Sequence, residues 1–266
     1  MRSAGPGTGI LSALAWRLGT GFLGSLETLG GMALMLAQGL AWSVRPPWRP
    51  RLFLRQMAGI GVHSTLVVLL TGIFAGMVLA LQGYYGFKKF GGESLLGATV
   101  ALSLTRELGP VLTGLMVTAR AGSAMAAELG TMRVTEQIDA LAVMAVHPVQ
   151  YLVSPRLVAS VVMLPLLTGL VDLIGIGGGY FVGVVLLRIN PGIFMSNIRE
   201  FLVLEDITQG LVKAAVFGGL MGMIGCFHGF FAGEGAEGVG RATTRAVVHT
   251  AVAILAMDYI LTSLLF

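Results

Sequence analysis

The sequence predicts an all-α polytopic membrane protein, and three observations carry this prediction. Mean hydropathy is +0.86, hydrophobic residues make up 55% of the 266 and charged residues only 11%. The stretch 57–87 contains no Lys, Arg, Asp or Glu, and a hydrocarbon core of about 30 Å needs only about 20 helical residues. The 39 glycines fit the same class, because small residues let membrane helices approach closely.

The N-terminal residues 1–44 are predicted to form an amphipathic helix that lies at the membrane surface. Apolar residues recur in it at spacings of three and four, which places them on one stripe. They are Leu11, Leu14, Leu18, Phe22, Leu26, Leu29, Met32, Leu36 and Leu40. Arg17 and Glu27 interrupt the apolar run, so the segment is not typical of a signal peptide. The alternative is a true membrane span over residues 28–44.

Residues 45–266 are predicted to form one domain with five membrane spans. Three prolines between Arg45 and Arg51 predict a loop before the first span. Pro110 is expected to kink the second span, and Asp172 with glycines 177–179 to interrupt the third. With the N-terminus inside, the inner loops hold more basic residues than the outer ones, which favours a cytoplasmic N-terminus and an external C-terminus. The predicted spans cover about 57–87, 95–125, 157–187, 211–232 and 246–266.

Four charged residues fall within or at the ends of these spans, where charge is costly: Arg106, Glu107, Lys213 and Asp258. Their depths are broadly similar, so we expect the two acids and the two bases to neutralise one another. One interpretation is a set of structural ion pairs that hold the bundle together. The other is a latch, meaning an ion-pair cluster that opens and closes an outer cavity. Asp172 has no obvious partner and either faces a cavity, pairs with another subunit or is protonated.

A short polar segment lies between the second and third spans, on the predicted cytoplasmic side. It belongs to a predicted helix over about 134–145, and Thr135 is expected to cap the N-terminus of that helix. From spacing alone, an ordinary interfacial loop helix is the favoured interpretation. The residues of the segment that concern us are Glu136, Gln137, Ile138, Asp139 and Leu141.

Nothing in the sequence predicts catalysis, a bound metal or a bound cofactor. The glycine-rich run at 229–235 lacks the lysine of a phosphate-binding loop. His63, His147, His228 and His249 are far apart and show no metal-ligand spacing. The net charge of +4 is spread over loops rather than gathered in a patch typical of nucleic-acid binding.

Several motifs together resemble the MlaE/YrbE family of ABC-transporter permeases, which partner MCE-domain proteins. The resemblance covers nearly all of residues 50–266, and the combination of motifs is highly specific although no single motif is. The motifs are Leu-Gln-Gly-Tyr at 81–84, Ala-Leu-Ser-Leu at 101–104, Arg-Glu-Leu-Gly-Pro at 106–110, Ala-Arg-Ala-Gly-Ser-Ala at 119–124, Ala-Glu-Leu-Gly-Thr-Met at 127–132, Thr-Glu-Gln-Ile-Asp-Ala-Leu at 135–141 and Gly-Arg-Ala-Thr-Thr-Arg-Ala-Val-Val at 240–248.

The resemblance implies a homodimeric permease in the inner membrane of a diderm bacterium. Two cytoplasmic ATPase subunits bind such a permease and hold the ATP and magnesium. The 136–141 segment is similar to the coupling helix that enters a groove on the ATPase. A hexamer of MCE-domain subunits caps the periplasmic side, and some systems add a cytoplasmic STAS-domain regulator. The complex moves phospholipid between inner and outer membranes and so maintains outer-membrane lipid asymmetry.

The resemblance also assigns a lipid path. By position, an outward-open cavity between two permeases would be lined by Leu79, Phe87, Phe90 and Leu108. From the residues alone, an aromatic belt at the membrane interface is the favoured interpretation of this region. The family's intramembrane charged positions match Glu107, Lys213 and Asp258, which favours the latch.

Two other functions compete with an ATP-driven permease. One is an ion- or proton-coupled secondary carrier that uses Glu107, Asp172 and Asp258. The other is a purely structural anchor for the MCE partner.

Overall fold

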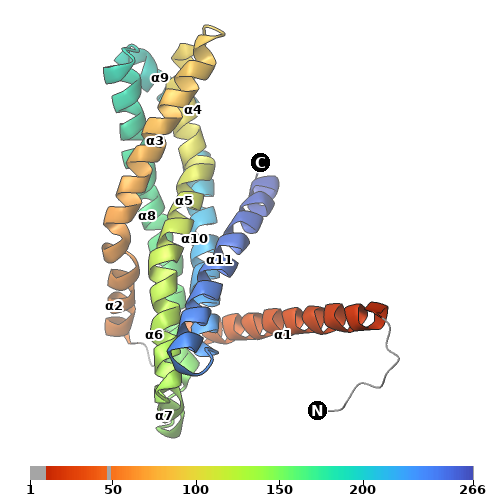
Figure 1. Ribbon diagram of the computed structural model, residues 1–266. Helices are drawn as coiled ribbons and strands as arrows, with labels where there is room; N and C mark the ends of the chain where they lie inside the picture. The colour runs from red at the N-terminus through yellow and green to blue at the C-terminus, as the bar shows by residue number, and fades with distance from the viewer. Residues whose placement is uncertain (1–9, 47–48, 266) are drawn as a thin grey trace.

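The computed structural model describes residues 10–46 and 49–265, and this part of the chain contains helices and no β-strand. Five of its stretches are long and apolar enough to cross a membrane, so the prediction of an all-α membrane protein with five spans is confirmed. Figure 1 shows one bundle with helix α7 (Gln137–Val143) at one end and helix α9 (Pro191–Phe201) at the other. The five stretches are Pro50–Lys88, Glu93–Val134, Val149–Leu186, Leu204–Phe230 and Gly235–Leu265.

Helix α1 (Ile10–Val44) projects sideways from the α7 end of this bundle (Figure 1). Its C-terminal part packs on the bundle: Met35 is buried, and the hydroxyl oxygens of Ser43 and Ser154 lie 2.8 Å apart. The choice between a helix along the membrane surface and a span over residues 28–44 stays a prediction. The predicted apolar stripe is exposed at Leu26, Leu29 and Leu40, as expected for side chains that face lipid.

The first span consists of α2 (Pro50–Ile60), the 3₁₀ turn η1 (Val62–Ser64) and α3 (Thr65–Lys88). The loop predicted up to Arg51 is too long, because Pro50 opens α2. Proline is well tolerated at the first helical position, since the N–H that it lacks would have no partner there. Residues 1–9 of the predicted N-terminal helix and residues 47–48 of the predicted loop lie outside the described residues.

The second span extends beyond the predicted 95–125 and contains two π-helical turns, η3 and η4. The π-helical turn η3 ends two residues before Pro110, and a kink at Pro110 stays a prediction. This turn places Pro110 in the first turn of α5, where its missing N–H is tolerated. The elements are η2 (Glu93–Leu95), α4 (Leu96–Ser103), η3 (Leu104–Leu108), α5 (Gly109–Val117), η4 (Thr118–Gly122) and α6 (Ser123–Val134).

The third span consists of η5 (Val149–Val153), α8 (Ser154–Tyr180) and η6 (Phe181–Leu186). Asp172 and glycines 177–179 do not interrupt it, so that prediction is wrong. Gly178 and Gly179 serve packing instead, because a Cβ on Gly178 would collide with the carbonyl oxygen of Ile73 in α3 and one on Gly179 with the side chain of Val100. A Cβ on Gly177 would meet nothing within 4 Å. Helix α9 follows and is absent from the predicted elements. The Asn190 side chain caps it by accepting from the Gly192 N–H at 2.8 Å.

Helices α10 (Leu204–Phe230) and α11 (Gly235–Leu265) form the last two spans, and both begin earlier than predicted. The first turns of α11 are polar, so hydropathy does not mark them as part of a membrane helix. They are stabilised by an ion pair one helical turn apart, in which Glu237 Oε1 and Arg241 Nη1 lie 3.0 Å apart.

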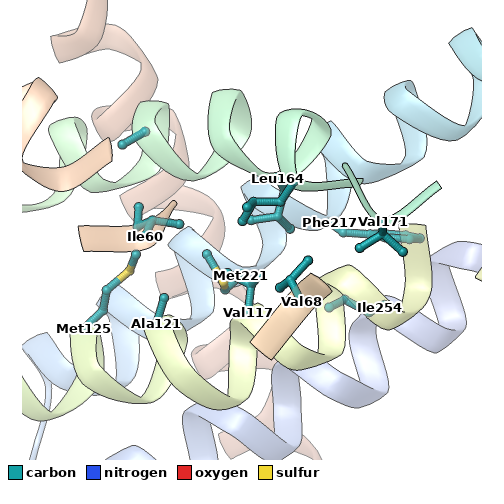
Figure 2. Close-up of a cluster of buried hydrophobic side chains, with 12 residues drawn as sticks. Ile60, Val68, Val117, Ala121, Met125, Leu164, Val171, Phe217, Met221 and Ile254 are labelled. Carbon is teal, nitrogen blue, oxygen red and sulfur yellow. The ribbon is translucent and has the colours of Figure 1, made fainter. Parts of the chain in front are cut away.

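Three hydrophobic clusters fill the bundle along its length. Figure 2 shows the middle cluster, which joins Val68 of α3, Val117 of α5 and Leu164 of α8 with Phe217 of α10 and Ile254 of α11. All five side chains are buried. The middle of the bundle is therefore one continuous core to which every span contributes. A second cluster lies at the α9 end and a third at the α7 end.

Helix α3 packs closely on α8 because glycine stands at their crossing. A Cβ on Gly76 would collide with the backbone of Gly175. Gly76→Ala is expected to force the two helices apart and to destabilise the bundle by about 1–3 kcal/mol, as over-packing does. Gly86→Ala is the matched control on α3, because a Cβ there meets nothing within 4 Å. Thermal unfolding of the detergent-purified protein checks this; equal midpoints for both variants would contradict the role of Gly76.

Candidate functional site

A group of charged and polar side chains lies inside the bundle around Lys213 of α10, which is fully buried. Lys213 Nζ lies 2.8 Å from Glu107 Oε1 and 3.3 Å from Asp258 Oδ1. It also donates to the hydroxyl oxygen of Thr262 at 2.7 Å. We call these four residues the Lys213 cluster. The structure thus brings together three of the four charged residues expected to neutralise one another, and adds a threonine that charge alone does not reveal.

A backbone carbonyl completes the surroundings of Lys213. The carbonyl oxygen of Arg106 accepts from Lys213 Nζ at 3.0 Å. In a regular helix this carbonyl would accept from the N–H four residues later, but that position is Pro110, which has no N–H. The proline therefore frees an acceptor for a buried cation. With both acids ionised and Lys213 protonated, the cluster carries one net negative charge.

The guanidinium of Arg106 points to a different partner, Asp206 in the first turn of α10. Arg106 Nη2 lies 2.6 Å from Asp206 Oδ1, and Nε donates to the same oxygen at 2.7 Å. The other carboxylate oxygen of Asp206 accepts from the Val203 N–H and so caps α10. Sequence reasoning missed Asp206 because a fourth span starting at 211 leaves it in a loop. Its position three residues after the N-cap of α10 was the available signal.

Asp172 of α8 is buried and makes no ion pair with any residue that the structure describes. Within the described ranges its Oδ1 also has no hydrogen-bond partner. This oxygen packs against Gly109, where a Cβ would collide with it. An ionised carboxylate enclosed in this way is costly, so Asp172 is an unusual side chain for the middle of a span.

Helix α7 is a small element that protrudes from one end of the bundle (Figure 1). Glu136, Gln137 and Asp139 are exposed, and Leu141 is half-buried. Asp139 forms an ion pair with Arg133 at the protein surface, in which Asp139 Oδ1 and Arg133 Nη1 lie 2.8 Å apart. The start of α7 therefore exposes two acids, Glu136 and Asp139, whereas its end exposes the apolar Val143.

Ile138 anchors α7 to the bundle. Its side chain is only 2% exposed and belongs to the cluster that includes Leu129 of α6 and Val153 of η5. The predicted coupling residues include Ile138, but a side chain this buried positions α7 rather than contacting a partner. An ion pair between the buried Arg156, at Nη2, and the exposed Glu128, at Oε2, 2.8 Å apart, ties α6 to α8 at the same end.

The expectation that Thr135 caps α7 is wrong. Glu136 precedes α7 in the left-handed region with φ 57°, and its side chain makes no capping bond. The Thr135 hydroxyl donates instead to the Thr131 carbonyl oxygen at 2.8 Å. The turn is so tight that Thr135 still belongs to the end of α6.

Three of the four residues expected to line a lipid cavity lie together at the α9 end. Leu79, Phe87 and Leu108 are partly buried in the hydrophobic cluster around Leu96. Phe90 differs, with 88% of its surface exposed. Their lining of a cavity between two copies stays a prediction.

Among the described residues, no group of three or more His, Cys, Asp or Glu side chains could hold a metal ion. Two histidines that are distant in sequence do meet, because α10 and α11 are neighbours. His228 Nε2 and His249 Nδ1 lie 2.9 Å apart. Sequence spacing cannot reveal such a pair.

Comparison with known proteins identifies a family of similar sequences. The family model described as "Permease MlaE" matches residues 53–264. A probable ABC transporter permease protein of Rickettsia conorii is 46% identical over 240 residues, which are 90% of this chain and 93% of that protein. The intermembrane phospholipid transport system permease protein MlaE of Haemophilus influenzae is 41% identical over 250 residues, 94% of this chain and 96% of that protein. A probable ABC transporter permease protein of Synechocystis is 44% identical over 213 residues, 80% of this chain and 81% of that protein.

Proposed function

The chain belongs to the MlaE permease family, as its motifs predict, and we propose on this basis that it is the permease subunit of an ABC transporter for phospholipid. The transport would run between inner and outer membranes and maintain the lipid asymmetry of the outer membrane. Support comes from the Haemophilus influenzae relative, whose name describes an intermembrane phospholipid transport system and which matches 94% of this chain.

The observation that carries the proposal is the exposed, firmly anchored helix α7 at the end of the second span. Its exposed acids Glu136 and Asp139 are open to a soluble partner, while Ile138 ties it to α6 and η5. A partner that grips α7 would therefore move the second span, which also carries Glu107. The sequence contains no phosphate-binding loop, so two ATPase subunits would supply ATP hydrolysis with their own ATP and magnesium.

The proposed assembly contains two copies of this chain, two ATPase subunits and a periplasmic hexamer of MCE-domain subunits, with a STAS-domain regulator in some systems. It would lie in the cell inner membrane, with the N-terminus and α7 cytoplasmic and the C-terminus periplasmic. Helix α11 is suited to form the contact between the two copies, because only 11% of its most apolar segment is buried inside the single chain. One exposed stripe at helical spacing consists of Val248, Val252, Leu255 and Tyr259.

In this proposal the Lys213 cluster is the latch beside the lipid cavity. Acyl chains would lie on Leu79, Phe87, Phe90 and Leu108, where each buried CH₂ contributes about 0.8 kcal/mol. Opening the cavity would require the ion pairs of Lys213 to rearrange, so movement of the second span would be linked to lipid access.

Reconstitution tests the proposal. Proteoliposomes that contain the chain with its ATPase and MCE partners should transfer a fluorescent phospholipid to acceptor vesicles only when ATP is present. Mass spectrometry of the purified permease should find bound phospholipid. Lipid transfer that is driven by an ion gradient and does not depend on ATP would contradict the proposal. A permease without bound lipid and without transfer would support the structural anchor instead.

Asp172, a buried carboxyl that makes no ion pair with any described residue, favours a proton-coupled carrier. Asp172→Asn is expected to leave ATP-dependent transfer largely unchanged, because the amide has the same size and no ion pair is lost. A proton carrier that uses this carboxyl would lose transfer completely. The same vesicle assay, repeated with and without a pH gradient, measures lipid transfer by this variant. A complete loss of transfer by a normally folded variant would contradict the proposal that ATP drives transport.

A further inference from the structure

A cavity of about 410 Å³ lies at the α7 end of the bundle, between α1, α2 and the start of the third span. Its volume falls in the range typical of small-molecule sites. It is far along the bundle from the residues assigned to the lipid path, which lie in the α9-end cluster. The described residues that line it are Trp42, Ser43, Arg45, Arg49, Pro50, Leu52, Phe53, Val146, Gln150, Tyr151, Ser154, Pro155 and Val158.

The charge of the lining is entirely positive. Arg45 and Arg49 line the cavity, and none of its described lining residues is Asp or Glu. Both guanidiniums lie over aromatic rings: Arg45 Cζ is 5.8 Å from the Trp42 ring centroid, and Arg49 Cζ is 5.0 Å from that of Tyr151. Stacking of this kind orients a guanidinium without neutralising it, so the donors remain available to an anion.

Two further groups at the cavity favour an anion. Helix α2 begins here, and its N-terminus has neither a side-chain cap nor an acidic residue in the first turn. The positive end of an uncapped helix attracts phosphate oxygens. The amide nitrogen of Gln150 is buried and has no hydrogen-bond partner among the described residues. A buried donor without an acceptor is costly, and Gln150 is one of the residues that line the cavity.

The rest of the wall is apolar and lies where a membrane surface would lie. Leu52 and Phe53 of α2 and Val158 of α8 line the cavity beside the charged groups. The cavity is bounded on one side by α1, the predicted surface helix, and on another by the base of the first span. A free phosphate would leave this apolar wall uncovered, whereas a lipid would place its glycerol and first acyl carbons there.

We propose that this cavity binds the phosphate and glycerol region of an anionic phospholipid from the membrane leaflet at the α7 end. Arg45 and Arg49 would hold the phosphate, with the positive end of the α2 dipole nearby. Leu52, Phe53 and Val158 would contact the upper acyl carbons. Such a lipid would join the surface helix α1 to the first span. The proposal requires only membrane insertion and does not rest on the proposed transport function.

Native mass spectrometry of the detergent-purified full chain tests the site. The probes are palmitoyl-oleoyl phosphatidylglycerol, phosphatidylcholine with the same chains, and inorganic phosphate. We expect the phosphatidylglycerol adduct to form at least about tenfold more tightly in the wild type than in Arg45→Gln/Arg49→Gln, because each lost charge-assisted hydrogen bond weakens binding by about that factor. Arg55→Gln/Arg245→Gln removes the same charge outside the cavity and should bind like the wild type.

A second variant keeps every charge. Val158→Phe fills the apolar part of the cavity and should weaken phosphatidylglycerol binding while size-exclusion chromatography shows a normally folded protein. Equal binding by the cavity and control variants would overturn the proposal. So would equal binding of phosphatidylcholine and phosphatidylglycerol to the wild type, or full competition by millimolar phosphate, which would indicate a free-anion site.

Discussion

Replacing Lys213 with methionine is expected to abolish phospholipid transfer in the reconstituted system and to destabilise the bundle. Methionine is similar in length but uncharged, so Glu107 and Asp258 lose the cation that both contact. Removing one partner of a buried ion pair costs about 3–5 kcal/mol. We expect the lower end of this range, because 37% of the Glu107 side chain is exposed and remains partly solvated. Thermal unfolding and the vesicle assay measure the two effects separately.

A compensated variant distinguishes a latch from structural ion pairs. Lys213→Met with Glu107→Gln and Asp258→Asn removes all three charges, so the thermal midpoint should recover. Transfer should remain lost if the cluster must rearrange during transport. If transfer recovers together with stability, the cluster only holds the helices together.

The neighbouring ion pair provides the matched control for this series. Arg106→Gln with Asp206→Asn removes one acid and one base close to the Lys213 cluster. It leaves the Arg106 carbonyl in place as an acceptor for Lys213. Transfer should persist in this variant, so a loss equal to that of Lys213→Met would show that any charge removal in this region is harmful.

Reversing the charge of α7 should abolish co-purification with the ATPase while the permease still inserts and folds. In Glu136→Lys with Asp139→Lys the two exposed acids at the start of α7 become basic, which would repel a groove that normally receives acidic side chains. The effect on folding should be small. The lost Arg133–Asp139 pair is exposed, and such pairs contribute about 0–1 kcal/mol. Glu136 already occupies the left-handed region, where lysine is no more strained.

The start of α11 supplies the control for this experiment. Glu234→Lys with Glu237→Lys makes the same change of charge with exposed residues and breaks a comparable surface pair, Glu237–Arg241. The ATPase should still co-purify with this variant. If both double variants lose the ATPase, general electrostatics at this end of the bundle explains binding, and α7 has no special role.

The five spans were predictable because hydropathy is a property of local sequence. The early starts of α10 and α11 and the existence of α9 were not, since their polar residues are satisfied by capping and ion pairs that depend on the folded helices. Asn190 and Glu237 show this directly: each stabilises a helix terminus that hydropathy does not mark.

The charged residues of the site were predictable from the sequence, but the groups that they contact were not. Glu107, Lys213 and Asp258 stand out in any membrane sequence because ionised side chains are rare there. Thr262 does not stand out, and neither does the Arg106 carbonyl that accepts from Lys213. Ile138 was expected among the coupling residues, and only the packing of α7 on α6 and η5 shows that it is buried.

Because the second span is long, α7 lies at the end of a long helical rod and moves far when the rod tilts. The span is one helical stretch of 42 residues. At about 1.5 Å per residue it is about 60 Å long, whereas a bilayer with its headgroups is only about 40–45 Å thick. Part of this rod therefore stands clear of the membrane, and a soluble partner can act on it without approaching the headgroups. A small tilt about a point near Glu107, which lies well inside the rod, would swing α7 widely while Glu107 moves much less. In the proposed transporter, a large movement of the ATPase would therefore become a small movement at the Lys213 cluster.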